Sequence, residues 1–84
     1  MPDISMYCTQ ICPYCKRAES LLERKGVQVK KIFIDSNEQE KHKMFEKTGR
    51  RTVPQIIIGE RCVGGYDDLA ELDSQGKLDP LLSK

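Results

Sequence analysis

The sequence predicts an α/β fold in which a four-stranded mixed sheet is flanked by helices, in the order β-α-β-α-β-β-α. Three observations support this prediction. An amphipathic helical segment separates two β-like segments near the N-terminus, a second helical segment follows, and two short β-like segments joined by a two-residue turn precede a last helical segment. A strand, a crossover helix and a second strand favour a right-handed βαβ unit with parallel strands.

The first half of the chain supplies that βαβ unit. We predict a strand over Asp3–Cys8, a helix over Pro13–Lys25 and a strand over Val27–Asp35, with Gly26 just past the helix, where a left-handed backbone suits glycine. Cys12 then lies at the carboxyl end of the first strand, where open α/β sheets tend to place their chemistry.

The second helix is predicted over Asn37–Thr48. Ser36 and Gln39 have the spacing of a capping box at its start, and Met44 and Phe45 are expected to pack inward. The sequence therefore predicts that this helix covers part of the sheet.

The C-terminal part is predicted to hold an antiparallel hairpin and a third helix. Its strands are Gln55–Ile58 and Arg61–Val63, and the turn Gly59-Glu60 suits type II′ because glycine accepts the positive φ. Asp67 is the expected cap of the third helix, which closes before Gly76. An apolar tail follows, formed by Leu78, Leu81 and Leu82.

Size and composition exclude several classes of protein. The chain has 84 residues and a formal net charge of +1, so we expect one small domain, residues 1–84, without the basic surface of a nucleic-acid binder. Four cysteines are too few for a disulfide scaffold, and the N-terminus lacks the pattern of a secretory signal. No apolar run approaches the ~20 residues of a membrane helix. We expect a soluble, cytoplasmic monomer that does not bind membranes.

The most informative motif is the quartet Cys12-Pro13-Tyr14-Cys15 at the start of the first helix. Pro13 suits the first helical position, because its φ fits and its missing N–H would have no partner there. Cys12 is therefore the predicted N-cap. The free N–H groups of the first turn and the positive end of the helix dipole favour its thiolate, and Lys16 adds a cation if its side chain folds back.

Cys15 is the predicted partner of Cys12. Helical side chains three residues apart stack, so the two Cα atoms lie about 5 Å apart, within the range of a disulfide. Cys15, Ala18 and Leu22 have the spacing of a buried helical face. An exposed Cys12 in front of a buried Cys15 is the arrangement of an attacking and a resolving thiol.

Two other interpretations of the quartet are a structural disulfide and half of a zinc site. A disulfide over so short a loop removes little entropy from the unfolded state. Zinc needs a second close pair of ligands, which the sequence lacks, so no metal is expected. Redox use is the favoured interpretation.

The quartet, the element order and two further motifs, Thr52-Val53-Pro54 and Gly64-Gly65-Tyr66-Asp67-Asp68-Leu69, resemble the glutaredoxin family, most of all its small bacterial dithiol type, over essentially the whole chain. The resemblance implies a thioredoxin-like fold and a glutathione-dependent thiol-disulfide oxidoreductase. Cys12 alone would reduce glutathione mixed disulfides, and Cys12 with Cys15 would reduce protein disulfides. Glutathione would be the cosubstrate, and glutathionylated and disulfide-containing proteins the partners.

The resemblance also implies a glutathione site. It makes Val53–Pro54 a cis peptide bond facing Cys12, with the Val53 backbone free to pair with the cysteinyl segment like an added strand. The helix start at Gly65-Tyr66-Asp67 would bind the γ-glutamyl carboxylate, and Asp67 the neighbouring ammonium. The remaining implied binding residues are Tyr14, Arg51, Thr52 and Tyr66. Without the resemblance, an extended strand start at Thr52-Val53-Pro54 and a capping role for Asp67 remain open.

Two positions depart from the family pattern. Thr9 stands where a lysine is common, so activation of the thiol depends more on the helix dipole and Lys16. Cys8 ends the first strand, and its closeness in sequence to the quartet raises the question of whether it forms a disulfide or a glutathione adduct under oxidation. More often such a residue is a small buried apolar filler, as Cys62 on the hairpin can be.

Two rival functions stay open at this point. One is an iron-sulfur cluster carrier that uses Cys12 of two chains and two glutathiones, against which Pro13 argues by stiffening the loop and removing a backbone donor. The other is a thioredoxin-like electron donor served by a dedicated reductase. Glutathione binding at Thr52-Val53-Pro54 and Asp67 distinguishes the favoured function from the second rival.

Overall fold

The computed structural model describes residues 3–82. Its elements are β1 (Ile4–Cys8), α1 (Pro13–Arg24), β2 (Lys30–Phe33), α2 (Glu38–Thr48), β3 (Gln55–Ile58), β4 (Arg61–Gly64), α3 (Tyr66–Ser74) and α4 (Leu78–Leu82). The predicted order is confirmed, with one addition, because the apolar tail forms the short helix α4. No helix in this part of the chain combines the length and the apolar character that a membrane crossing needs.

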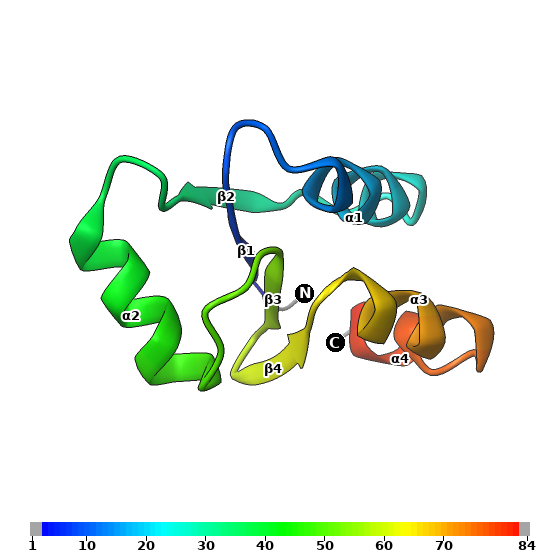
Figure 1. Ribbon diagram of the computed structural model, residues 1–84. Coiled ribbons are helices and arrows are strands. Elements are labelled where there is room, and N and C mark those ends of the chain that lie inside the picture. Colours follow the sequence, from blue (N-terminus) through cyan, green and yellow to red (C-terminus); the bar gives the residue numbers. More distant parts are fainter. Residues whose placement is uncertain (1–2, 83–84) are drawn as a thin grey trace.

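The strands form one mixed sheet in the order β2-β1-β3-β4. β1 is parallel to β2, as the predicted βαβ unit requires, and antiparallel to β3, which in turn is antiparallel to β4. Figure 1 shows α1, α3 and α4 on one side of this sheet and α2 on the other. The central strand β1 thereby carries the chain from the middle of the sheet directly to the start of α1.

The alternation of side chains along β1 divides the core in two. Met6 and Cys8 face α1, α3 and α4 in the larger apolar cluster, whereas Tyr7 points the other way and packs with Ile34 and Met44 beneath α2. Each fully buried aliphatic side chain contributes roughly 1.5–3 kcal/mol through removal of apolar surface from water. The larger cluster holds α1 and α3 against the same face of the sheet.

The second strand is shorter than predicted. β2 covers Lys30–Phe33 and not Val27–Asp35. Among the described residues it pairs only with Ser5–Cys8 of β1 and has no partner strand on its other side. Val27 is buried without being part of the ladder. The apolar pattern that suggested a longer strand therefore reflects burial of these side chains and not hydrogen bonding to a neighbouring strand.

Two details of α2 also differ from the prediction. Asn37 and not Ser36 is the N-cap, because its Oδ1 accepts the Glu40 N–H at 3.2 Å. Met44 is buried as predicted, but Phe45 is 40% exposed. The guanidinium of Arg51 lies 4.7 Å from the centre of the Phe45 ring and covers its outer face. The inward prediction for Phe45 is wrong because that position lies at the edge of the buried stripe.

Candidate active site

The Cys12 sulfur lies at the start of α1, between this helix and the segment that precedes β3. Cys12 is the N-cap in an extended conformation, as predicted, and its Sγ accepts the backbone N–H of Cys15 at 3.3 Å. The thiol also lies 3.8 Å from the Val53 carbonyl oxygen, to which it donates. No acidic residue occupies the first turn of α1. The positive helix end thus acts on a half-buried sulfur without a competing carboxylate in that turn.

Cys15 is the buried member of the pair, with 4% of its surface exposed. Burial, followed by the hydrogen bond with Cys12, raises the pKa of the Cys15 thiol to about 12, against a lowering by the backbone amide of Thr9. Cys15 therefore stays protonated at neutral pH. The predicted asymmetry between an accessible sulfur and a buried one is present in the structure.

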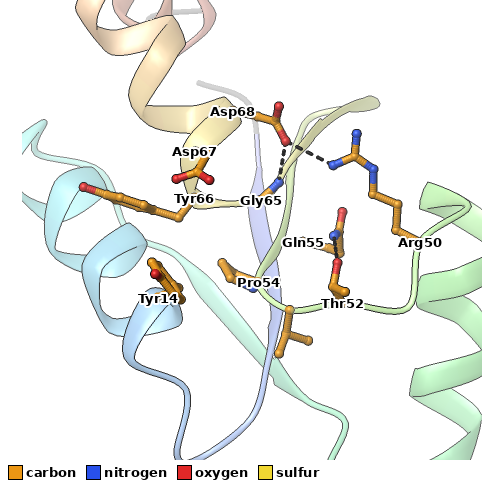
Figure 2. Close-up of a pocket in the computed structure, with 10 residues that line it drawn as sticks. Tyr14, Arg50, Thr52, Pro54, Gln55, Gly65, Tyr66, Asp67 and Asp68 are labelled. Atoms are coloured by element: carbon orange, nitrogen blue, oxygen red, sulfur yellow. Dashed lines mark hydrogen bonds and ion pairs between the residues drawn. The ribbon is translucent and has the colours of Figure 1, made fainter.

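A pocket opens where three segments meet: the start of α1, the loop before β3 and the start of α3 (Figure 2). Cys12 does not line it, but its thiol contacts the carbonyl of Val53, which does. Seven of the predicted binding residues line it, namely Tyr14, Thr52, Val53, Pro54, Gly65, Tyr66 and Asp67. Arg50, Gln55 and Asp68 also line it. Asp68 belongs to the motif quoted above but was not expected to take part in the site, and no pattern in the sequence pointed to Arg50 or Gln55. We call this the α1–α3 pocket.

The loop before β3 supplies one wall of the α1–α3 pocket. The Val53–Pro54 peptide bond is cis, as the family resemblance implied. Gly65 approaches this loop closely, since a Cβ atom at Gly65 would lie 3.5 Å from the Pro54 carbonyl oxygen. Gln55 is buried at the base of the pocket, where its Nε2 donates to the Thr52 hydroxyl at 3.3 Å. The Gly65 contact places the loop against the start of α3, and the Gln55 hydrogen bond ties Thr52 to the beginning of β3.

The start of α3 supplies the opposite wall. Gly65 is the N-cap, so the predicted capping role of Asp67 is wrong. Asp68 instead accepts the Gly65 N–H at 3.0 Å and a hydrogen bond from Arg50 Nη1 at 3.1 Å, as Figure 2 shows. The neighbouring Asp67 carboxylate is exposed on the pocket side. One acidic side chain therefore closes the helix start while the other stays available to a ligand.

Two tyrosines form a third side of the pocket. The rings of Tyr14 and Tyr66 lie 6.2 Å apart with 38° between their planes. Arg17 covers the Tyr14 ring, its guanidinium carbon 5.2 Å from the ring centre. The neighbouring ring and cation already restrict these two tyrosines. They therefore offer apolar surface to a ligand and lose little further side-chain entropy when it binds.

Besides Cys12 and Cys15, two residues selected from the sequence do not line the α1–α3 pocket. Arg51 stacks on Phe45 of α2, on a surface shared with His42. Lys16 lines a different groove, beside Cys8. The cation that does line the pocket is Arg50. Adjacent arginines at a loop point in different directions, which no pattern in the sequence predicts.

The residues of the site are suited to an organic ligand that carries charges of both signs. Arg50 and the N–H groups at the start of α3 attract anions, and Asp67 attracts a cation. Within residues 3–82, no group of three or more histidine, cysteine, aspartate and glutamate side chains is arranged to hold a metal ion.

A mixed four-stranded sheet with a cysteine pair at the start of its first crossover helix, next to an open polar pocket, is typical of a thiol-disulfide oxidoreductase of the thioredoxin-like fold. The model of the family described as Glutaredoxin matches residues 4–63. The chain belongs to the glutaredoxin family, whose general function is glutathione-dependent thiol-disulfide oxidoreduction. The resemblance inferred from the sequence, the fold and the oxidoreductase class are thereby confirmed.

Individual relatives agree with this assignment. The chain is 46% identical over 82 residues to Glutaredoxin 3 of Escherichia coli strain K12, covering 98% of this chain and 99% of that protein. It is 51% identical over 83 residues to a glutaredoxin of Pseudomonas aeruginosa, covering 99% of each.

Solved structures show the same fold. A buckwheat glutaredoxin-glutathione complex matches with a TM-score of 0.89 and 29% identity over 98% of this chain and 77% of that one. The solution structure of glutaredoxin from Brucella melitensis matches with a TM-score of 0.85 and 46% identity over 98% and 89%.

Proposed function

We propose that this protein reduces glutathione mixed disulfides through Cys12 alone and protein disulfides through Cys12 with Cys15, using glutathione as cosubstrate. The observation that carries the proposal is the hydrogen bond from the Cys15 amide to the Cys12 sulfur at 3.3 Å. It directs the positive end of α1 at the one accessible sulfur of the pair, and thiolate is the reactive form in disulfide exchange.

The monothiol route has two exchange steps. The Cys12 thiolate attacks the glutathionyl sulfur of a protein-glutathione mixed disulfide, so that a bond from Cys12 to glutathione forms while the protein leaves as a thiolate and takes up a proton. A second glutathione, as thiolate, then attacks the glutathionyl sulfur on Cys12. Oxidised glutathione leaves, and Cys12 returns to the thiolate.

The dithiol route starts with attack of Cys12 on a protein disulfide. The resulting mixed disulfide is resolved by Cys15, which loses its proton, attacks the Cys12 sulfur and releases the second protein thiol. Because burial keeps Cys15 protonated, this thiol does not compete with Cys12 for external disulfides. One glutathione opens the Cys12–Cys15 disulfide to a mixed disulfide, and a second glutathione attacks it, so that oxidised glutathione leaves and both cysteines return to the reduced state.

Glutathione fits the α1–α3 pocket by charge and by backbone pairing. Within residues 3–82, the Val53 N–H has no backbone hydrogen-bond partner, so it is available to the cysteinyl segment. The γ-glutamyl carboxylate meets the N–H groups at the start of α3, and Asp67 accepts from the ammonium. Arg50, not Arg51, is the cation on the pocket side for the glycyl carboxylate. Tyr14 and Tyr66 cover the bound tripeptide.

The cellular setting follows from the chemistry. A dithiol that must return to the reduced state after each turnover requires a reducing compartment with abundant glutathione. We therefore propose that the protein acts as a monomer in the cytoplasm on glutathionylated and disulfide-containing proteins.

The roles of the two cysteines are tested with Cys12→Ser and Cys15→Ser. Turnover of a glutathione mixed disulfide and of a protein disulfide is followed in the presence of glutathione and glutathione reductase. Cys12→Ser is expected to lose both activities, because the attacking sulfur is gone. Cys15→Ser is expected to keep the first and lose the second. An active Cys12→Ser protein would show that another residue attacks the disulfide.

The glutathione pocket is tested separately by an NMR titration. Addition of glutathione to Cys15→Ser protein whose Cys12 is blocked by methylation is expected to shift the backbone amides of Val53, Tyr66 and Asp67. Amides on α2 serve as the internal control, since that helix lies across the sheet. Unshifted amides in the pocket would favour a donor that is reduced by a dedicated reductase.

A further inference from the structure

A second groove lies beside the active site, at the junction of β1, α1 and β2. It has a volume of about 190 Å³ and shares no residue with the α1–α3 pocket. Cys8 and Cys15 both line it, together with Lys16 and Lys31. We call it the Cys8 groove. Two thiols therefore border one small space, and only one of them has a role in the reaction described above.

Cys8 is fixed in position by the sheet. It is the last residue of β1 and is 1% exposed, and its carbonyl accepts the Ile34 N–H at 3.0 Å. The alternation of β1 turns its side chain toward α1, into the same apolar cluster as Cys15. The Cys15 sulfur in turn faces the backbone amide of Thr9, the residue next to Cys8.

A thiol in this position has one accessible reaction. Its burial excludes glutathione and protein disulfides, whereas Cys15, which carries a disulfide during turnover, lines the same groove as Cys8. We propose that Cys8 is a third redox-active thiol, which exchanges with the Cys12–Cys15 disulfide to give a Cys8–Cys15 disulfide and a free Cys12. This inference rests on the proposed dithiol route, because that route supplies the disulfide.

The exchange needs no additional oxidant. The Cys8 thiol passes its proton to solvent and attacks the Cys15 sulfur; a bond between Cys8 and Cys15 forms, and the bond between Cys15 and Cys12 breaks. Cys12 leaves as a thiolate. The start of α1 stabilises this leaving group, since the Cys15 amide already donates to the same sulfur in the reduced protein. The protein carries one disulfide before and after the step.

The charges around Cys8 control the speed of this step. Burial raises the pKa of the Cys8 thiol, Lys31 on β2 lowers it, and Glu19 on α1, Cys12 and Asp35 raise it. Lys31 is itself paired with Glu19 at 2.8 Å, which weakens its effect on the sulfur. The attacking thiolate is therefore scarce at neutral pH, and the exchange is faster in alkaline solution.

The consequence concerns the oxidised protein. A Cys12–Cys15 disulfide blocks both routes until glutathione reduces it. Transfer of that disulfide to Cys8 and Cys15 returns Cys12 to its reactive form, so the oxidised protein keeps a monothiol activity toward glutathione mixed disulfides. Cys8 would then keep Cys12 free for the first step of the monothiol route, while the second step still consumes reduced glutathione.

The experiment locates the free thiol in the oxidised protein. Full-length Cys62→Ser protein, which lacks the exposed fourth cysteine, is oxidised with one equivalent of diamide, held at mildly alkaline pH, quenched with acid and alkylated with N-ethylmaleimide in urea. Chymotrypsin cleaves after Tyr7 and Tyr14, which separates Cys15 from a peptide that holds Cys8 and Cys12. Tandem mass spectrometry then reads which of these two cysteines carries the maleimide.

The proposal expects a fraction of the molecules to carry maleimide on Cys12 with Cys8 linked to Cys15, and expects this fraction to rise with the holding time. Maleimide on Cys8 alone at all times overturns it and leaves the Cys12–Cys15 dithiol route intact. Absence of any disulfide to Cys15 overturns the dithiol route itself. The two failures are therefore distinguishable in one sample.

Matched variants guard against a folding artefact. Cys8→Ala and Cys8→Ser both replace a small buried side chain, and either one that keeps the circular dichroism of the parent is usable. In the oxidised parent we expect a rapidly alkylated thiol, that of Cys12, to develop over time. In these two variants we expect no such thiol. Persistence of that thiol without Cys8 would contradict the exchange.

Discussion

The starts of α1 and α3 face the same pocket but are built in opposite ways. At α1 the cap is a sulfur atom, and no acidic side chain lies in the first turn. At α3 the cap is Gly65, and the first turn carries Asp67 and Asp68. One helix start thus leaves its positive end to the Cys12 sulfur, while the other is balanced by carboxylates of its own.

This difference separates chemistry from binding. An uncompensated helix start stabilises a full negative charge, which is what a reactive thiolate requires. At the start of α3, Asp68 is hydrogen-bonded to the helix end and Asp67 is exposed. This start therefore offers backbone N–H groups and a negative charge side by side, which suits the zwitterionic end of a γ-glutamyl group. The same backbone feature therefore activates a nucleophile at α1 and recognises a ligand at α3, and the nearby acidic residues decide between the two.

The largest expected effect comes from Gly64, which precedes the α3 start. Gly64 has a φ of +114°, and a Cβ atom there would collide with the Asp68 carboxylate. Gly64→Ala combines backbone strain with the loss of the Asp68 contact to Gly65, so we expect a loss of roughly 2–4 kcal/mol in unfolding free energy. Urea denaturation measures it.

Gly26→Ala is the matched control for Gly64→Ala. Gly26 has a φ of +80°, and a Cβ atom added there would meet no other atom within 4 Å, so only the backbone term of roughly 1–2 kcal/mol applies. Equal losses for the two variants would show that Asp68 does not hold the start of α3.

The buried thiol of α1 predicts a loss of stability in alkali. Burial raises the pKa of Cys15 to about 12 in the folded protein, whereas an unfolded cysteine titrates near ~8.5, so the folded state binds more protons above that pH. The contribution is complete below pH ~8.5 and is lost as the pH rises toward the folded value. Urea denaturation of reduced protein should show a fall of about 2 kcal/mol by about pH 10 from this thiol.

Cys15→Ala isolates this contribution. Cys8 is also a buried thiol with a raised pKa, so the variant is expected to lose stability in alkali as well, but with a shallower slope. If the unfolding free energy fell with pH at the same slope in the parent and in Cys15→Ala, the fold would not be raising the pKa of Cys15.

Asp67→Asn tests the ligand-binding side of the comparison. The exchange removes one charge without changing the shape of the side chain, and hydrogen bonds to charged groups contribute about 1.5–3 kcal/mol. Because Asp67 is exposed, we expect the lower end of that range, about a tenfold fall in kcat/KM for a glutathione mixed disulfide. A mixed disulfide of cysteinylglycine, which lacks the γ-glutamyl group, should be turned over equally by both proteins. A fall with both substrates would place Asp67 outside ligand recognition.

Much of this site could be predicted from local sequence. Cys12 as N-cap and Pro13 at the first helical position follow from rules that act within one turn of a helix, and the burial of Cys15 follows from helical periodicity. The βαβ order then places the pair at the end of β1. These features depend on neighbours a few residues apart, and the structure shows each of them.

The features that sequence reasoning missed depend on distant contacts. Asp68 closes the start of α3 because Arg50, far away in the chain, meets its other side. Arg51 turns away because Phe45 offers an aromatic face.

The cis bond at Val53–Pro54 was expected only through the family resemblance, since an unassisted X–Pro bond is cis in about 5–6% of cases. Direction of side chains in a loop is set by tertiary packing, which no local pattern records.

Pro13→Asp makes the start of α1 resemble that of α3. A carboxylate in the first turn competes for the positive helix end, an effect of about 1 kcal/mol, so iodoacetamide should alkylate Cys12 about fivefold more slowly at neutral pH than in Pro13→Asn. Both variants lose the proline ring, and only one gains a charge, so their ratio isolates the electrostatic effect. Equal rates would mean that the helix end does not activate the sulfur.

The smallest expected effect concerns the cation that completes the α3 start. Arg50 and Asp68 lie 3.1 Å apart with 56% and 45% of their side chains exposed, and exposed ion pairs of this kind contribute about 0.2–1 kcal/mol. Arg50→Gln should therefore lower the unfolding free energy by about 0.5 kcal/mol in dilute buffer, and less at high salt. In an Asp68→Asn background the same substitution should have almost no effect, because its partner charge is gone. An undiminished effect there would show that Arg50 stabilises the fold through other contacts, and that Asp68 closes the helix start without help from across the pocket.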